Sequence, residues 1–302
     1  MVSEVSILIP IFNFDVTALV QKLLDQCQQA AISFEIICLD DASNDFFKKS
    51  NRKLKFLKNI IYEELPTNIS RAAIRNKLAM RAKYSYLLFL DNDSCLVTEQ
   101  FIINYLQAAD LFSVFIGGTE YPSWAPETTY RLHWHYGRHR EQRPAAIRQQ
   151  QPYKKLQVNN LFVSRTLYLA NPLPEVVQTY GHEDTLWGLY LEKANIPVQH
   201  LNNPVLHVGL EPVTSFLVKT EQAIVNMVDL QNTNNSSFSS SLYWVYKILK
   251  KCRLLGAFTW FFKKIKPFLL IQLQSGRPHL FLFDVYKLGL LAHVIQKKNK
   301  SF

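Results

Sequence analysis

The sequence predicts an α/β protein whose sheet is mostly parallel and is flanked by helices. Two observations support this fold class. Strand-like and helix-like segments alternate four times in the first part of the chain, and two of the strand-like segments end in aspartates, at 40–41 and at 91–93. Alternation of this kind is typical of a parallel sheet with helices on both faces. Such sheets bind ligands beyond the carboxyl ends of their strands, where these aspartates stand.

The expected elements follow in order along the chain. The first helix is indicated by apolar side chains at helical spacing, namely Val16, Leu19, Val20, Leu23, Leu24 and Cys27. The expected segments of this half are a strand at 2–12, the helix from 16 to 30, a strand at 34–41, an amphipathic stretch to about 58, a strand at 59–65, a helix at 70–82 and a strand at 84–91.

After Ser94 the pattern changes. We expect, in order, a helix near 98–109, strands at 113–118 and 158–165, a helix at 182–194 that ends before Pro197, and a short strand at 203–208. The segment 120–157 between the two strands is rich in arginine and reads as an irregular stretch. A long loop in a compact domain is usually functional or mobile.

The net positive charge of the chain comes from one end. The formal net charge is +10, yet residues 236–302 hold twelve Lys or Arg and one acid, Asp284. The rest of the chain is therefore close to neutral. A polar break at 231–241 precedes the basic end. We expect two modules: an α/β domain at 1–230 and a basic, aromatic-rich helical extension at 231–302.

Cysteine use and hydropathy indicate the compartment. The four cysteines form no CxxC pair, and Cys38 lies in an apolar strand-like run, as buried free thiols do. The N-terminal apolar run follows Glu4 and lacks a basic region before it, and no apolar run reaches the ~18 residues of a membrane span. We expect a cytoplasmic protein, or one held peripherally at the inner face of the cell membrane.

Glycine is absent from the first four strand–helix turns, because the earliest glycine is Gly117. A GxGxxG loop or a phosphate-binding P-loop is therefore excluded there. A divalent cation held by carboxylates could neutralise nucleotide phosphates instead. Asp91-Asn92-Asp93 places two carboxylates on one side of an extended segment at the end of an apolar strand, which suits Mg²⁺ or Mn²⁺. A solvated turn is the alternative for this motif.

Several motifs together resemble a known family. "SILIPIFN", "EIICLDDASND", "NISRAAIRN" and "YLLFLDNDS" occur in the order and approximate spacing of family 2 glycosyltransferases of GT-A fold, a Rossmann-like fold of nucleotide-diphospho-sugar transferases. The resemblance is strong over 3–110, and "YGHEDTLWG" with "NPVLHVGLE" extends it to about 211. It is closest to inverting enzymes of bacterial polysaccharide or lipopolysaccharide synthesis, and it leaves 236–302 outside.

The resemblance implies a nucleotide site. In the family, the aromatic residue of the opening motif stacks on the base, usually uracil, and the second aspartate of "DDxS" accepts its imide N–H. Asp40 is expected to be structural. The implied nucleotide-binding residues are Pro10, Phe12, Asp41, Arg71, Arg75 and Asp91. The alternatives are a core role for Phe12, a helix-capping role for Asp41 and a solvated helix face for the two arginines.

The resemblance also implies a catalytic and metal site. In the "GHED" element, Asp184 would be the catalytic base and Glu183 would contact the acceptor or the donor sugar. Asp93 would bind the metal ion, and His207 would complete its coordination, which favours Mn²⁺ over Mg²⁺. Asn159 and Asn160 would line the sugar pocket. Acids in a first helical turn also stabilise the helix, and a histidine that ends a short strand is often structural.

The implied function is a metal-dependent inverting transfer of a sugar from a UDP-sugar to a hydroxyl of a glycan or lipid-linked glycan, with Mn²⁺ or Mg²⁺ as cofactor. Two alternatives come from other classes. A non-catalytic nucleotide- or glycan-binding relative would keep Phe12 and Asp41 without turnover. A sugar-nucleotide nucleotidyltransferase would need a glycine-rich basic N-terminal loop, which the sequence lacks.

The basic extension predicts an amphipathic helix near 242–255, with Leu242, Val245 and Leu249 on one stripe and lysines on another. Such a helix with Trp and Phe nearby suits an anionic membrane surface. A helical subdomain with solvated lysines is the alternative. We expect no nucleic-acid partner, since the basic residues are interleaved with aliphatic ones and no binding motif is present.

Overall fold

The computed structural model describes residues 2–154, 156–177, 179–232 and 240–299. The chain divides into two compact units, which are treated separately here. The first consists of Met1–Pro122, Gln142–Gln178 and Glu183–Gly209, and the second of Ser123–Glu141, Thr179–His182 and Leu210–Phe302.

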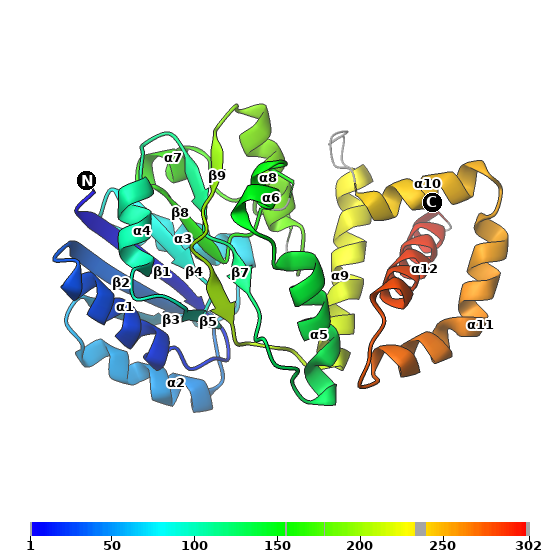
Figure 1. Ribbon diagram of the computed structural model, residues 1–302, viewed down its shortest axis with the longest axis horizontal. Coiled ribbons are helices and arrows are strands. Elements are labelled where there is room, and N and C mark those ends of the chain that lie inside the picture. The colour runs from blue at the N-terminus through cyan, green and yellow to red at the C-terminus, as the bar shows by residue number, and fades with distance from the viewer. Residues whose placement is uncertain (1, 155, 178, 233–239, 300–302) are drawn as a thin grey trace. The chain divides into compact units, whose positions relative to one another are not determined.

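The first unit is built on a seven-stranded sheet in the order β3-β2-β1-β4-β8-β6-β9 (Figure 1). Strands β1, β2, β3 and β4 are parallel neighbours, as are β6 and β9, whereas β8 runs antiparallel to both β4 and β6. The strand bounds are β1 Glu4–Ile11, β2 Ser33–Asp40, β3 Ile60–Glu64, β4 Tyr86–Leu90, β6 Val114–Ile116, β8 Asn160–Ser164 and β9 Val198–His200. The predicted mostly parallel α/β fold is confirmed.

Helices cover both faces of this sheet. They are α1 Thr17–Gln29, α2 Asp45–Asn51, the 3-10 helix η1 Arg52–Phe56, α3 Arg71–Arg81, α4 Phe101–Ala108, α6 Ala145–Gln149, α7 Arg165–Ala170 and α8 Glu183–Lys193. Helix α3 begins where the Ser70 hydroxyl accepts a hydrogen bond from the Ala73 N–H at 3.2 Å, a side-chain N-cap.

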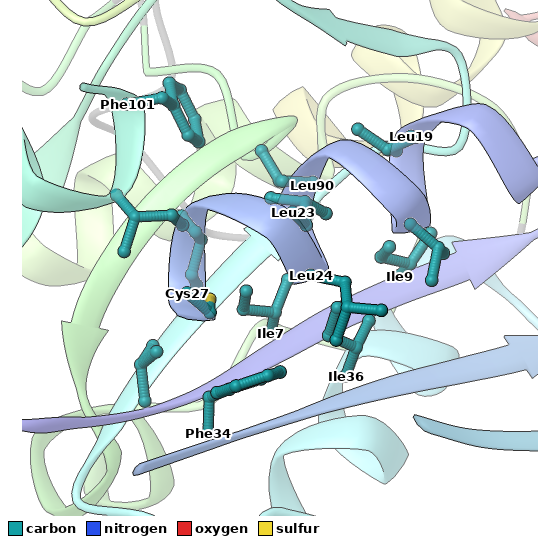
Figure 2. Packing of buried hydrophobic residues seen from close by; sticks show 14 of the residues in the cluster. Ile7, Ile9, Leu19, Leu23, Leu24, Cys27, Phe34, Ile36, Leu90 and Phe101 are labelled. Carbon is teal, nitrogen blue, oxygen red and sulfur yellow. The ribbon is translucent and has the colours of Figure 1, made fainter. Parts of the chain in front are cut away.

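Alternate residues of β1 enter two separate apolar clusters, because successive side chains of a strand point to opposite faces. Ile7 and Ile9 pack with Leu23 of α1, on the face that also receives Phe101 of α4 (Figure 2). On the other face, Leu8 shares a cluster with α3 and α8, whose buried members include Ile74, Leu78, Trp187 and Leu191. The core thus fixes the strand ends from both sides.

Three segments differ from the sequence-based expectations. The stretch 120–157 was expected to be irregular, but it contains η2 Thr128–Tyr130, α5 Arg131–Tyr136, the π-helix η3 Gly137–Glu141 and α6. The helices α7 and α9 Val213–Asn232 were not expected. Helix α7 is six residues long, too short for its apolar spacing to be recognised, and α9 lies beyond the segment that the family motifs cover.

The second unit is helical. Helix α12 Leu280–Asn299 contacts α9, α10 Ser241–Lys251 and α11 Leu255–Leu273, and its buried residues lie all around the helix. The predicted amphipathic helix corresponds to α10. The predicted domain boundary at 230/231 stays a prediction: α9 ends next to it, and residues 233–239 of the polar break lie outside the described residues. None of the described helices is long and apolar enough to cross a membrane.

Candidate functional site

The ends of β1, β2 and β4 are joined by hydrogen bonds between the loops that follow them. Asn13, in a left-handed conformation (φ 49°), receives a hydrogen bond on its Oδ1 from the Asn44 N–H and donates its own N–H to the Ser43 hydroxyl at 2.8 Å. Asn92 Nδ2 donates to the carbonyl of Phe12 at 3.1 Å. These bonds hold the three loops in one place beyond the carboxyl ends of the strands.

Phe12 leaves its ring accessible at this edge. The residue is 51% exposed, although it directly follows the buried strand β1. A core role for Phe12 is therefore excluded, and its ring is available to a planar ligand. Pro10 lies two residues earlier, beyond the last residue pair between β1 and β4, which is Leu8↔Phe89.

Asp41 is buried and faces the loop that precedes α3. Its Oδ1 accepts the Ile69 N–H at 2.8 Å, and its Oδ2 accepts from Asn68 Nδ2 at 2.9 Å. Burial raises the pKa of Asp41 to about 6, and the neighbouring charge of Asp40 adds to this, against the hydrogen bond from Ile69. Asp40 accepts the Ser43 N–H and the Tyr62 hydroxyl, which holds the turn after β2.

Asp91 is held by two arginines from one face of α3. Arg75, which is nearly fully buried, donates to Oδ1, and Arg71 donates to Oδ2 at 3.3 Å. Burial alone would raise the pKa of Asp91, but attraction to Arg75 and Arg71 outweighs burial and holds this pKa below its ordinary value. Neither arginine is merely a solvated helix residue, since both reach the end of β4.

Asp93 is brought next to His207 by a second, three-stranded sheet, β5-β10-β7. Strand β10 Val205–His207 pairs antiparallel with β5 Ser94–Leu96, with His207 opposite Ser94, and the Val208 N–H donates to the Asp93 carbonyl at 2.9 Å. The His207 Nδ1 lies 3.4 Å from Asp93 Oδ1. Strand β7 Thr119–Glu120 completes the sheet.

A divalent cation fits this pair of side chains. One carboxylate and one imidazole within 3.4 Å of each other are suitable ligands for Mn²⁺, and diphosphate oxygens and water would complete the coordination. Within the described ranges, no three His, Cys, Asp or Glu side chains are grouped to hold a metal by themselves. The neighbouring Asp91 is engaged by two guanidinium groups instead.

Glu183 and Asp184 form the first turn of α8. Glu183 is buried, and its Oε1 accepts from Arg71 Nε at 2.8 Å. In the part of the chain that the structure describes, its other oxygen, Oε2, is buried without a hydrogen-bond partner. Arg71 thus joins Glu183 to Asp91, and with it the start of α8 to the end of β4.

Asp184 carries a raised pKa. Its Oδ1 accepts the Thr185 N–H at 2.7 Å. Burial raises the pKa of Asp184 to about 7, and the charge of Glu183 contributes, against the Thr185 hydrogen bond and the charge of Arg71. A carboxyl group with this pKa can accept a proton near neutral pH, which suits a general base.

Asn159, just before β8, and Asn160, the first residue of β8, differ in their surroundings. Asn159 donates to Thr119 Oγ1 at 2.8 Å, and its Oδ1 is buried with no hydrogen-bond partner among the described residues. Asn160 is fully buried: its amide donates to the carbonyls of Gly118 and Asn203, and its Oδ1 accepts the Tyr105 hydroxyl at 2.6 Å. The structure therefore does not bring Asn160 to the surface of the site.

Three residues of the site were not singled out from the sequence. Asn68 holds Asp41, Thr119 holds Asn159, and Tyr121 places its ring edge-on to His207 with centroids 5.3 Å apart. Asn68 lies in the quoted "NISRAAIRN" motif and could have been found there. Thr119 and Tyr121 follow β6, and only the pairing of β7 with β10 reveals their position.

A mostly parallel sheet with aspartates at the ends of β2 and β4 is the GT-A architecture of nucleotide-sugar glycosyltransferases. The sequence profile described as "Glycosyl transferase family 2" matches residues 6–168, and the chain belongs to this family. Both the predicted fold and the predicted family are thus confirmed. Among curated proteins, no sequence matches the chain.

Solved structures agree on the fold. The mannosyltransferase PcManGT from Pyrobaculum calidifontis, in complex with GDP-Man and Mn²⁺, aligns with a TM-score of 0.53 and 11% identity over 76% of this chain. The alignment covers 65% of PcManGT, just under two thirds of its length. Glucosyl-3-phosphoglycerate synthase from Mycobacterium tuberculosis, in complex with Mn²⁺, UDP and glucosyl-3-phosphoglycerate, aligns with a TM-score of 0.50 and 14% identity over 75% of this chain and 79% of that one.

Proposed function

We propose that this protein is a metal-dependent, inverting glycosyltransferase that moves a sugar from a UDP-sugar to a hydroxyl of a glycan or lipid-linked glycan. The observation that carries the proposal is Asp184, a carboxyl group with a pKa near 7, which Glu183 and Arg71 connect to the carboxylate at the end of β4. A base of this kind, next to the edge where a nucleotide sugar would bind, is what hydroxyl activation requires.

The base of the donor nucleotide is assigned to Phe12 and Asp41. The exposed ring of Phe12 offers a stacking face. Each oxygen of Asp41 accepts a hydrogen bond from the loop before α3, and an ionised carboxylate has about four lone-pair sites, so it can still accept the imide N–H of uracil. The loop contacts orient the carboxylate for that purpose.

Asp93 and His207 are assigned to the metal ion. When bound, a divalent cation would neutralise the charge that develops on the diphosphate leaving group. We assign Asp91 to orienting Arg71 and Arg75 beside the nucleotide, because each of its two oxygens accepts a hydrogen bond from one of these arginines.

Asp184 is assigned as the base. It takes the proton of the acceptor hydroxyl while the acceptor oxygen bonds to the anomeric carbon and the bond from that carbon to the diphosphate oxygen breaks. Attack from the face opposite the leaving group inverts the anomeric centre. Glu183, with an unpaired buried oxygen within the described chain, is assigned to a hydroxyl of the acceptor or the donor sugar.

Thermal-shift titration tests the donor site without an acceptor, because a ligand that binds the folded state raises its unfolding temperature. We expect a rise with uridine nucleotides that requires Mn²⁺ and is lost in Asp93→Ala. GDP and CDP sugars belong in the same panel. The absence of a shift with every nucleotide would contradict the assigned donor site.

Asp184→Asn tests the chemistry. We expect donor binding to persist and transfer to fall by about 10²–10⁴-fold, the usual contribution of a general base. Transfer that survives within a few-fold would exclude Asp184 as the base. Donor binding by the wild-type protein without turnover on any acceptor would favour a non-catalytic relative. Inversion is tested separately, by NMR of the product, in which a retained configuration would contradict the mechanism.

A further inference from the structure

Helix α11 is apolar on two opposite faces. Its inner face is buried, by Phe262, Leu269 and Leu273. Four large apolar side chains lie on the opposite side and are 53–70% exposed: Trp260, Phe261, Phe268 and Ile271. These residues follow the spacing i, i+1, i+8, i+11, which is one stripe of a helix, and we call this stripe the outer face of α11. A surface helix normally presents polar residues on that side.

Exposed apolar residues also occur on the preceding helix and turn. Trp244 and Ile248, one turn apart on α10, are exposed, and so is Leu254 in the turn between α10 and α11. Isolated exposed apolar residues are ordinary, but a series over two consecutive helices, with two tryptophans, marks an interaction surface.

The charge that accompanies this surface is of one sign. Six basic residues on α10, α11 and the turn are exposed, namely Lys247, Lys250, Lys251, Arg253, Lys263 and Lys264. The single acid of residues 236–302, Asp284 of α12, is already paired with Arg140 and Lys287. Over the described part of the chain, none of Lys250, Lys251, Lys263 and Lys264 takes part in an ion pair.

We propose that the outer face of α11, with the exposed residues of α10, binds the surface of an anionic lipid bilayer. Lys264 lies inside the apolar stripe, between Trp260 and Phe268. Lysine is depleted at the centre of protein–protein interfaces, because its charge would be desolvated there. At a bilayer its long stem lies along the apolar region while the ammonium reaches the phosphate headgroups.

The residue types of the outer face of α11 also suit the depth at which an interfacial helix lies in a bilayer. Tryptophan and phenylalanine are suited to the boundary between headgroups and acyl chains. Since none of the described helices can cross a membrane, α11 would lie in the plane of the interface, with its buried inner face still packed on α12. Lys263, beside the stripe, and the exposed basic residues of α10 and the turn add attraction to anionic headgroups.

The test uses the 302-residue chain and vesicles of phosphatidylcholine alone or mixed with phosphatidylglycerol. We expect co-sedimentation with the anionic vesicles, weakening with added salt. Trp260→Ser with Phe268→Ser should lower the partition coefficient at least about tenfold, since two interfacial anchors are lost. Phe46→Ser with Phe56→Ser is the matched control, because these rings are 77% and 89% exposed in the first unit. The control should bind as the wild type does.

A second pair of double variants tests whether the lysines of α11 contribute to vesicle binding. Lys263→Glu with Lys264→Glu should also lower binding at least about tenfold, whereas Lys22→Glu with Lys58→Glu, which makes the same change of net charge, should lower it much less. If both double variants lost vesicle binding equally, the effect would come from net charge alone, and the assigned surface would be wrong. Unchanged binding in Trp260→Ser with Phe268→Ser would do the same. A wild-type dimer in light scattering that this variant abolishes would make the surface a protein interface instead.

Discussion

Arg71 and Glu183, which lie 112 positions apart in the sequence, are joined by an ion pair of 2.8 Å between Nε and Oε1. The guanidinium of Arg71 also reaches Asp91 at 3.3 Å. The pair therefore links the first turn of α3, the end of β4 and the first turn of α8. It places opposite charges beside Asp184, and the two charges move the pKa of Asp184 in opposite directions.

The pH dependence of transfer should respond to these charges. The ionised form of Asp184 is the active one in the proposed mechanism, so kcat/KM should fall as the pH drops below about 7. Glu183→Gln removes a negative charge that raises this pKa, so the acidic limb of the pH profile should move to lower pH, by roughly half to one unit. The profile should be measured with donor and acceptor well below saturation.

Arg71→Gln provides the opposite change. Its guanidinium favours the ionised carboxylate, so removing it should raise the pKa of Asp184 and move the acidic limb to higher pH. Shifts of the same sign in both variants, or no shift in either, would mean that Asp184 does not control the acidic limb.

Gly209 should be essential for the position of the Asp93 carboxylate. A Cβ at residue 209 would lie 2.4 Å from Asp93 Oδ2 and 2.5 Å from Asp93 Cβ. Gly209→Ala should therefore displace this side chain from His207 and abolish the Mn²⁺-dependent part of the thermal shift with uridine nucleotides. Gly256→Ala is the control, because no atom lies within 4 Å of the corresponding Cβ. A full Mn²⁺-dependent shift in Gly209→Ala would argue against Asp93 as the ligand.

Phe12 offers a test of base stacking that leaves the core intact. Because the residue is half exposed, Phe12→Ala should change the unfolding temperature of the ligand-free protein little. Base–aromatic stacking contributes about 1–3 kcal/mol, so the affinity for UDP should fall at least about fivefold. Phe12→Tyr keeps the aromatic face and should keep the affinity. Calorimetric titration measures the UDP affinity of both variants. An affinity of Phe12→Ala equal to that of the wild type would mean that the ring does not stack on the base.

The sequence predicted those parts of the site that local patterns encode. Asp41 and Asp91 follow apolar runs, so their place at the edge of a parallel sheet could be inferred without coordinates. The ion pairs of Asp91 with Arg75 and Arg71 could not be predicted in the same way. From sequence spacing alone, the two arginines could equally have lain on a solvent-exposed face of the helix. The side of α3 that faces the sheet is set by the apolar residues that pack beneath it, here Ile74 and Leu78.

Other features depend on pairing between distant strands. Asn159 and Asn160 look equivalent in the sequence, yet only Asn160 is fully enclosed, because its amide bonds the loops at Gly118 and Asn203. The contact of His207 with Asp93 likewise requires β10 to pair with β5. Long-range pairings of this kind leave no periodic signal in a single sequence.

The apolar core beneath the site gives the last prediction. Leu23 is fully buried on α1, in the same apolar cluster as Ile7 and Ile9 of β1 (Figure 2). Leu23→Ala should lower the free energy of unfolding of the first unit by about 2–5 kcal/mol, from lost apolar burial and the cavity that remains.

Because the chain has two compact units, its unfolding need not be a single transition, and the change is best measured locally. Hydrogen exchange of β1 and α1 peptides measures the change locally, as faster exchange. Lys22→Ala, exposed on the same helix, should leave these rates nearly unchanged. Equal rates in both variants would mean that β1 and α1 exchange by local opening that leaves the Leu23 cluster intact.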